Sequence, residues 1–365
     1  MSRLTLFHVG FLFLILFFTT TAKAQKEAET FNVDSTLYEY YQRCQEYLLE
    51  PVVLSMSDTL FRMAGERHDE RMQAVAIATR LDYYYFQGTN EDSVIHYTNK
   101  VKEFAKATHQ PKYYYFAWAN RLVTYYLKTS RTNIALYEVQ NMLKEAQKED
   151  DKTGLSRCYN IMSQIYTIKR FDSMAFEWRL KEIELTEKYN IENYNISQTY
   201  AQIANYYISQ KKQKEALRAV EKAISTANSS TQQISAKLEY VNYYSKFGDF
   251  QAAEKILKEC QIAFEQDKRL ESIKKRLYNI ECLYYQQTRQ YQKALEAAEM
   301  QEKEEHRLSE SILSSSHYRT QGEIYQKMGN MNMAVKYLQM YINTDDSLKI
   351  ANEQVASSDF ATLLN

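Results

Sequence analysis

The side chains that most often carry chemistry are scattered along this 365-residue chain. Histidine occurs six times, at His8, His68, His96, His109, His306 and His317. None of them belongs to an HExxH motif or to a cysteine–histidine cluster, the arrangements in which proteins usually bind zinc. The sequence also has no GxSxG elbow for a nucleophilic serine and no Walker loop for a nucleotide. These absences argue against an enzyme and predict neither a metal nor a cofactor.

The four cysteines, Cys44, Cys158, Cys260 and Cys282, make no CxxC pair. Each of them falls inside a helical pattern, so we interpret them as small buried apolar side chains. Cys260 and Cys282 lie on consecutive predicted helices. They are the pair for which a disulfide is a hypothesis that can be tested.

Charge and composition exclude several classes of protein. The chain has 46 basic and 46 acidic residues, so no basic excess indicates a nucleic-acid partner. It has only seven glycines and two prolines. A sheet protein needs more turn residues than this, and a nucleotide-binding fold needs glycine loops. The composition therefore favours an all-α protein.

Residues 1–24 have the layout of a secretory signal peptide. Arg3 precedes a mostly apolar run from Leu4 to Phe18, and Ala22-Lys23-Ala24 stands before Gln25. The run is short for a transmembrane helix. We therefore expect export, most simply to the periplasm of a Gram-negative bacterium. Contact with a membrane is expected only through an uncleaved signal or a C-terminal span missing from this sequence.

A tyrosine recurs about every 40 residues, at Tyr84, Tyr126, Tyr166, Tyr207, Tyr244, Tyr285 and Tyr325. Nine residues later comes a small side chain, at Ser93, Ala135, Ala175, Ala216, Ala253, Ala294 and Ala334. Four residues after the tyrosine, a helix should end at Gly88, Ser130, Arg170, Lys211, Gly248, Arg289 and Gly329. This register predicts stacked helical hairpins, with the tyrosine ring packed between neighbours.

The segment GEIYQKMGNMNMAVKYL, residues 322–338, resembles a tetratricopeptide repeat. Gly322, Tyr325, Gly329 and Ala334 fall on characteristic positions of that motif. The resemblance covers roughly residues 70–345 and implies an α-α superhelix that binds other proteins. The motif's tryptophan and closing proline are missing, and the period exceeds the usual 34 residues, which indicates lengthened helices. Arg179 stands where the motif has an apolar residue.

We expect the array to be flanked on both sides. Residues 25–69 are predicted to form an N-terminal helical pair broken near Pro51, residues 70–345 seven repeats, and residues 346–365 a C-terminal helix. In the exported Bacteroidetes-type proteins that the chain resembles, such an array often continues into a membrane span and a kinase or DNA-binding domain. The resemblance therefore leaves a sensory role open.

The first helix of each hairpin should line a concave face, with exposed places two and six residues before the tyrosine. Two before are Asp82, Thr124, Gln164, Asn205, Asn242, Leu283 and Glu323. Six before are Ala78, Asn120, Asn160, Ala201, Leu238, Asn279 and Arg319. Amides at these places suit the backbone of an extended peptide, because an amide both donates and accepts hydrogen bonds.

Arg157 and Arg276, nine residues before their tyrosines, add cations for a carboxylate. The candidate groove residues are thus Asn120, Thr124, Arg157, Asn160, Gln164, Asn205, Asn242, Arg276, Asn279 and Arg319. The alternative is a hydrated groove whose amides bond neighbouring helices. We predict a non-enzymatic interaction module that binds a protein or peptide partner. The alternative is the periplasmic sensory region of a signalling protein whose membrane and output domains are absent from this chain.

Overall fold

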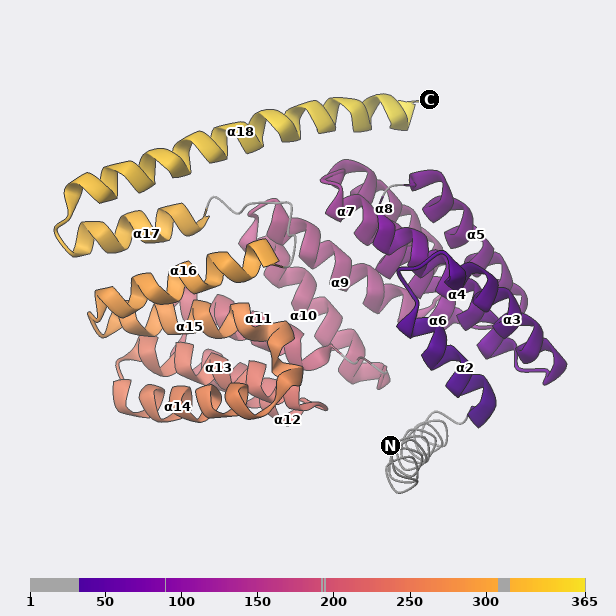
Figure 1. The fold of residues 1–365 in the computed structure, drawn as a ribbon, viewed down its shortest axis with the longest axis horizontal. Helices are drawn as coiled ribbons and strands as arrows, with labels where there is room; N and C mark the ends of the chain where they lie inside the picture. Colours follow the sequence, from indigo (N-terminus) through magenta and orange to yellow (C-terminus); the bar gives the residue numbers. More distant parts are fainter. Residues whose placement is uncertain (1–32, 89, 192, 194, 308–315, 365) are drawn as a thin grey trace, which may run out of the picture. The chain divides into compact units, whose positions relative to one another are not determined.

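The computed structural model describes residues 33–364 except 89, 192, 194 and 308–315. The predicted signal peptide lies outside these residues. All regular elements in the described part are helical, with no strand among them, which confirms the all-α prediction (Figure 1). The chain forms two compact units, and the boundary between them in the sequence falls between Ile161 and Met162. Within the described ranges, no helix has both the length and the apolar character needed to cross a bilayer.

The first unit contains the N-terminal helices. They are α2 (Ser35–Glu46), α3 (Val52–Glu66), α4 (Glu70–Gln87), α5 (Glu91–Ala107), α6 (Pro111–Tyr115), the π-helix η1 (Phe116–Val123), α7 (Thr124–Lys128), α8 (Thr132–Lys148) and the first part of α9 (Lys152–Ile168). A core that includes Leu37, Leu60 and Met72 joins α2 and α3 to α4. Pro51 stands directly before α3, where its missing backbone N–H interrupts no helical hydrogen bond.

The second unit contains the end of α9 and all later helices. They are α10 (Asp172–Tyr189), α11 (Ile196–Ser209), α12 (Gln213–Ser225), α13 (Ser230–Phe247), α14 (Phe250–Gln266), the 3-10 helix η2 (Lys268–Ile273), α15 (Lys274–Gln287), α16 (Tyr291–Arg307), α17 (Ser316–Lys327) and α18 (Met331–Leu364). The last of these runs without a break through residue 345, where the sequence places the start of a C-terminal helix.

The predicted helix stops are confirmed at the level of the backbone. All seven residues four places after the repeated tyrosine have a positive φ, from 58° at Lys211 to 90° at Gly248. In the six hairpins where the next residue is described, it donates its N–H to the carbonyl of the tyrosine, as Asp249 does to Tyr244 at 2.9 Å. This bond closes the last turn of the helix and satisfies a carbonyl that would otherwise lack a partner.

The small residues and the tyrosines also pack as expected. The six alanines of the register are buried, whereas Ser93 is only half-buried. Tyr244 packs against the core of α11–α13 and against the core of α13–α15. Tyr285 likewise contacts two successive cores. Tyr244 and Tyr285 therefore connect neighbouring hairpins.

Two local features depart from the simple motif. Arg179 is 7% exposed, and its guanidinium donates to Gln202 Oε1 at 2.8 Å and to Thr167 Oγ1 at 2.7 Å. Burial lowers the pKa of Arg179, while the Glu182 carboxylate opposes this effect. The second feature is η1, a π-helix in the first helix of its hairpin. It lies between Tyr84 and Tyr126, the longest interval between repeated tyrosines. A π turn accommodates an extra residue, which accounts for the greater length of this interval.

The four cysteines are unbridged and buried, in agreement with the interpretation from sequence. Cys260 belongs to the core around α13 and α15, whereas Cys282 belongs to the core around α16 and α17. Burial raises the pKa of Cys44 and of Cys260 to about 11. These thiols therefore stay protonated and unreactive near neutral pH.

Candidate functional site

The ten predicted groove residues are divided between the two units. The first unit holds Asn120, Thr124, Arg157 and Asn160. The second unit holds Gln164, Asn205, Asn242, Arg276, Asn279 and Arg319. A single groove that runs along all ten therefore stays a prediction, and each unit is described by itself.

The expectation that the places six residues before the tyrosine are exposed is wrong for several hairpins. Ala78, Ala201 and Leu238 are buried. Ala201 and Leu238 belong to the cores that adjacent hairpins share, so the crossing of neighbouring helices covers this position. Asn279 and Arg319 at the same position are exposed. Arg319 Nε donates to Glu323 Oε1, one turn along α17, at 2.8 Å.

Two of the predicted peptide-binding amides bond each other. Asn242 Nδ2, on α13, donates to Asn205 Oδ1, on α11, at 2.7 Å. Both side chains are half-buried. For these two residues the contact fits the alternative interpretation, in which amides of the groove bond neighbouring helices. Each amide still has polar groups left over, since asparagine carries two N–H donors and an acceptor oxygen.

The first unit has comparable cross-links on its first helices. Arg121 Nε, in η1, donates to Asp82 Oδ1, in α4, and both side chains are largely buried. Burial raises the pKa of Asp82, and the Arg121 guanidinium opposes that shift. Thr124 Oγ1 lies 3.3 Å from the Tyr85 hydroxyl, and it donates to the Asn120 carbonyl at 2.7 Å. These groups fix the spacing between neighbouring first helices.

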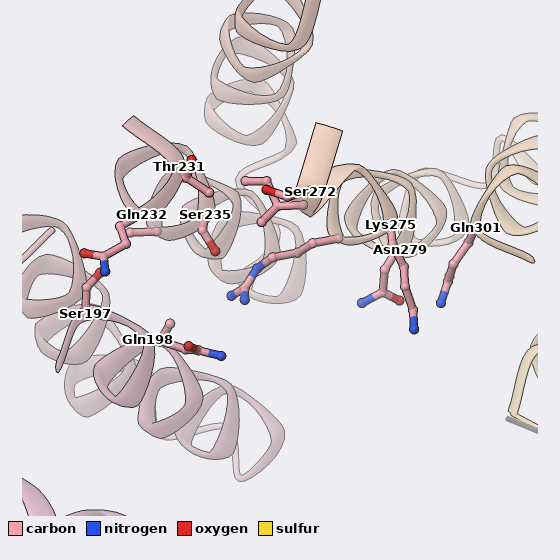
Figure 2. Close-up of a pocket in the computed structure, with 13 residues that line it drawn as sticks. Ser197, Gln198, Thr231, Gln232, Ser235, Ser272, Lys275, Asn279 and Gln301 are labelled. Atoms are coloured by element: carbon pink, nitrogen blue, oxygen red, sulfur yellow. The ribbon is translucent and has the colours of Figure 1, made fainter. Parts of the chain in front are cut away.

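A cavity of about 460 Å³ lies at the amino-terminal ends of the first helices α11, α13 and α15. Its polar lining includes Gln198, Thr231, Ser235, Lys275, Arg276 and Asn279. Figure 2 shows that Lys275 and Asn279 point in the same direction as Gln301 of α16. We call this cavity the α11–α13–α15 pocket.

Arg276 and Asn279 are the predicted residues that the structure brings into this pocket. Gln198 and Ser235, which the sequence analysis missed, stand nine residues before Tyr207 and Tyr244. Arg276 occupies that same place before Tyr285. The position nine residues before the repeated tyrosine was therefore the signal for the pocket. The sequence analysis used this position only in the two hairpins where it holds an arginine.

Both charged side chains that line the pocket are cations. Lys275 and Arg276 are the only charged side chains that line it, and the amino ends of the helices add partial positive charge. Arg276 forms an ion pair with Glu239, which is 1% exposed. In the described part of the chain, Glu239 Oε2 and Arg276 Nε have no hydrogen-bond partner. Glu239 thus balances part of the charge of Arg276, and the Arg276 Nε atom is itself buried.

The lining consists mainly of hydrogen-bonding and cationic side chains. It contains no histidine, cysteine or carboxylate. The Ser197 hydroxyl donates to the Ala223 carbonyl at 2.6 Å, so it is engaged in joining α11 to α12. Among the residues that the structure describes, no group of three or more His, Cys, Asp or Glu side chains could hold a metal ion. Amides, hydroxyls and two cations suit the carbonyl and carboxylate oxygens of a peptide.

Comparisons with known proteins identify the fold. No family model matches the sequence, and no curated protein matches it. Among solved structures, the Rap conjugation gene regulator of plasmid pLS20, in complex with the Phr* peptide, has a TM-score of 0.54 at 12% identity, over 80% of this chain and 78% of that chain. The apo quorum sensor NprR from B. thuringiensis has a TM-score of 0.51 at 14% identity, over 88% and 91%.

A tetratricopeptide repeat protein from Parabacteroides merdae is similar over 88% of this chain and 99% of its own, with a TM-score of 0.45 and 13% identity. The helical architecture, the repeated helix stops and the similarity to the Rap and NprR structures agree. The chain has the fold of a tetratricopeptide-type helical-repeat protein.

Proposed function

We propose that the chain is a non-enzymatic interaction module that binds an extended peptide segment of a partner in the α11–α13–α15 pocket. The observation that carries this proposal is the register of the lining. Gln198, Ser235 and Arg276 occupy the same place in three successive hairpins. An extended peptide presents carbonyl groups at regular intervals, and evenly spaced polar side chains match them.

The positive lining favours a peptide with an acidic group. Lys275 and Arg276 stand among neutral hydroxyls and amides in the lining, although the Arg276 guanidinium is already paired with Glu239. The pLS20 Rap regulator, which is similar in fold, was solved with a bound peptide. That precedent supports a peptide as the kind of ligand to test first.

The test combines peptide selection with a lining variant. Peptides selected from a random library on the purified chain are labelled, and their Kd is measured by fluorescence anisotropy. Gln198→Ala, Ser235→Ala and Asn279→Ala are combined, whereas Arg276 is kept because its loss would leave the Glu239 carboxylate buried without a partner. Each lost hydrogen bond is worth about 0.5–1.5 kcal/mol, so we expect affinity to fall at least tenfold.

A matched control replaces the amide pair outside the pocket. Asn205→Ala with Asn242→Ala removes the bond between α11 and α13 but none of the pocket lining. We expect this variant to melt at a lower temperature and to keep most of its peptide affinity. Equal binding by wild type and the folded triple variant would remove the pocket from the function.

Export is a separate part of the proposal, supported by the layout of residues 1–24. Protein recovered from cells should begin at Gln25 and appear in the periplasmic fraction. Mass spectrometry of the intact chain checks this, and an intact Met1 on cytoplasmic protein would contradict it.

The sensory role remains the second candidate, and the uninterrupted length of α18 favours it. This helix, the second of the last hairpin, runs for 34 residues without a break, as a rigid element that relays a binding event would. The reading frame downstream of Asn365 discriminates between the two functions. A membrane span followed by a kinase or helix-turn-helix domain would support the sensor, and a stop codon would support a free-standing interaction module.

A further inference from the structure

A second cavity, of about 340 Å³, lies within the first unit. It is lined by the connection from α5 to α6 and by the connection from α8 to α9. These connections are equivalent turns of successive hairpins. Gln110 donates its N–H to the Ala105 carbonyl at 2.7 Å, and Asp151 donates to the Ala146 carbonyl in the same way at 2.9 Å. We call the space that they line the α5–α8 cavity.

The polar lining of the α5–α8 cavity is mainly acidic. Glu145, Glu149 and Asp151 contribute three carboxylates. Lys106 and His109 are the only basic side chains that line it. The carboxylates outnumber the cations even when the histidine is protonated, so the lining favours a positively charged ligand.

The carboxylates of this lining already contact one alkyl ammonium of the chain. Lys106 Nζ lies 3.4 Å from Glu145 Oε1 and 3.4 Å from Glu149 Oε1, and the Lys106 side chain is 63% exposed. Asp151 accepts the N–H of Gly154 at 2.9 Å. A carboxylate can accept several hydrogen bonds, so Asp151 keeps acceptor capacity for a second ammonium.

The Tyr115 hydroxyl is the group of this lining that calls for a ligand. Tyr115 is 1% exposed, and its hydroxyl has no hydrogen-bond partner within the described ranges. Buried hydroxyls normally have one, because folding removes their hydrogen bonds to water. Burial raises the pKa of Tyr115, and the carboxylates of Asp151 and Glu149 raise it further. The hydroxyl end of the ring therefore lies toward the acidic lining, where a Cβ at Gly154 would come within 2.5 Å of its oxygen.

We propose that the α5–α8 cavity binds an alkyl ammonium, supplied by a free amine or by a lysine side chain of a partner. An ammonium has three N–H donors, which match the Tyr115 hydroxyl oxygen and the carboxylates of Glu149 and Asp151. The Tyr114 ring and Pro111 offer apolar surface for the alkyl chain. The cavity shares no residue with the α11–α13–α15 pocket, so this site is independent of the proposed peptide binding.

The first experiment measures the binding of cadaverine, a linear diamine, to the purified chain by isothermal titration calorimetry at pH 8, where both amines are protonated. We expect saturable binding at one site per chain and none for pentane-1,5-diol, the neutral analogue. Lysine with acetylated and amidated ends is the second probe. Whichever amine binds more tightly identifies the source of the ammonium. No binding by either amine overturns the proposal, and so does equal binding of the diol.

Tyr115→Phe removes the hydroxyl and keeps the ring. We expect amine affinity to fall by about three- to tenfold, because one hydrogen bond is lost. The melting temperature without amine should stay at the wild-type value, since no protein group bonds this hydroxyl in the described part of the chain. An unchanged affinity with a lower melting temperature would mean that the hydroxyl holds a structural water only, and would overturn the proposal.

Charge variants test the carboxylates. Glu149→Gln combined with Asp151→Asn should weaken amine binding at least tenfold, while asparagine still caps α9. The control, Glu103→Gln with Glu184→Gln, removes two exposed carboxylates outside the cavity and should leave binding unchanged. Lys106→Met should instead strengthen binding about threefold, because the competing ammonium is lost. A Lys106→Met variant that binds the amine more weakly, or a double carboxylate variant that binds it as wild type does, contradicts the assignment.

Discussion

At the scale of single residues, the ends of the first helices fix where each hairpin turns. Seven residues adopt the left-handed conformation at this place, but only Gly88, Gly248 and Gly329 are glycines. A residue with a side chain pays about 1–2 kcal/mol for this conformation. The repeat therefore tolerates a local cost at four of its turns, and the packing of the hairpins outweighs it.

Replacing one of these four residues by glycine should stabilise the fold. Lys211 has a φ of 58° and is exposed. Lys211→Gly removes the steric cost, but glycine also increases the conformational entropy of the unfolded chain. This entropy lowers the free energy of unfolding by about 0.5–1 kcal/mol. We expect a net gain of about 0.5–1 kcal/mol in the free energy of unfolding by urea. Arg218→Gly, on an exposed place inside α12, should instead lose about 1 kcal/mol.

A carboxylate beside the α11–α13–α15 pocket should titrate at unusually low pH. Arg269 donates to the Asp267 carboxylate through Nε, Nη2 and its backbone N–H, and these bonds hold the pKa of Asp267 at about 2. Because the folded pKa lies below the ordinary value near 3.9, this group stabilises the fold above about pH 4. That contribution is lost as the pH falls toward 2.

Arg269→Ala should raise the pKa of Asp267, as measured by carbon NMR of the carboxyl group during an acid titration. The Ser230 hydroxyl, 3.3 Å from Asp267 Oδ2, remains as a weaker partner. Arg67→Ala is the control, because Arg67 contacts Asp34 and not Asp267. An unchanged Asp267 titration in Arg269→Ala would mean that the guanidinium is not the cause of the shift.

At the scale of elements, the repeated register predicted most of the fold. Tyrosine, small residue and turn recur along the chain, and each marks a local event that the sequence encodes directly. The bond between Asn205 and Asn242 was not predictable in the same way, because it depends on the distance between two hairpins. The pocket was not predicted from the sequence, for a similar reason. Gln198 and Ser235 become a site only when three helix ends converge.

Close approach of helices within a hairpin gives a prediction for Gly322. A Cβ built there would lie 2.8 Å from Leu338 Cγ and 3.3 Å from the Leu338 backbone nitrogen. Alanine would favour the helix by about 0.5–1 kcal/mol, but overpacking costs about 1–3 kcal/mol. We expect Gly322→Ala to destabilise the chain by about 1–2 kcal/mol in urea unfolding.

The control for this change is Gly65, which is also helical. Its Cβ would meet only the end of the flexible Gln73 side chain. Gly65→Ala should therefore be neutral or stabilising. If both variants behave alike, close packing of α17 on α18 is not what requires glycine at position 322.

At the scale of the whole molecule, the cores found among the described residues are local, and neighbouring hairpins share them. Tyr244 and Tyr285 each contact two successive cores. The free energy of such an array is a sum over repeats and their nearest-neighbour interfaces. A local defect should therefore weaken adjacent hairpins more than distant ones.

Ala253→Leu tests this coupling, because Ala253 is fully buried between α13 and α14. The added methylenes should destabilise the array by about 1–3 kcal/mol. Hydrogen exchange should accelerate most in α13–α15, less in α11 and α17, and least in α2–α5. Glu254→Leu, the exposed neighbour, adds the same side chain without entering the core. Equal acceleration in every helix would reveal one cooperative unit, and no change in α13–α15 would mean that the alanines do not set the packing of the hairpins.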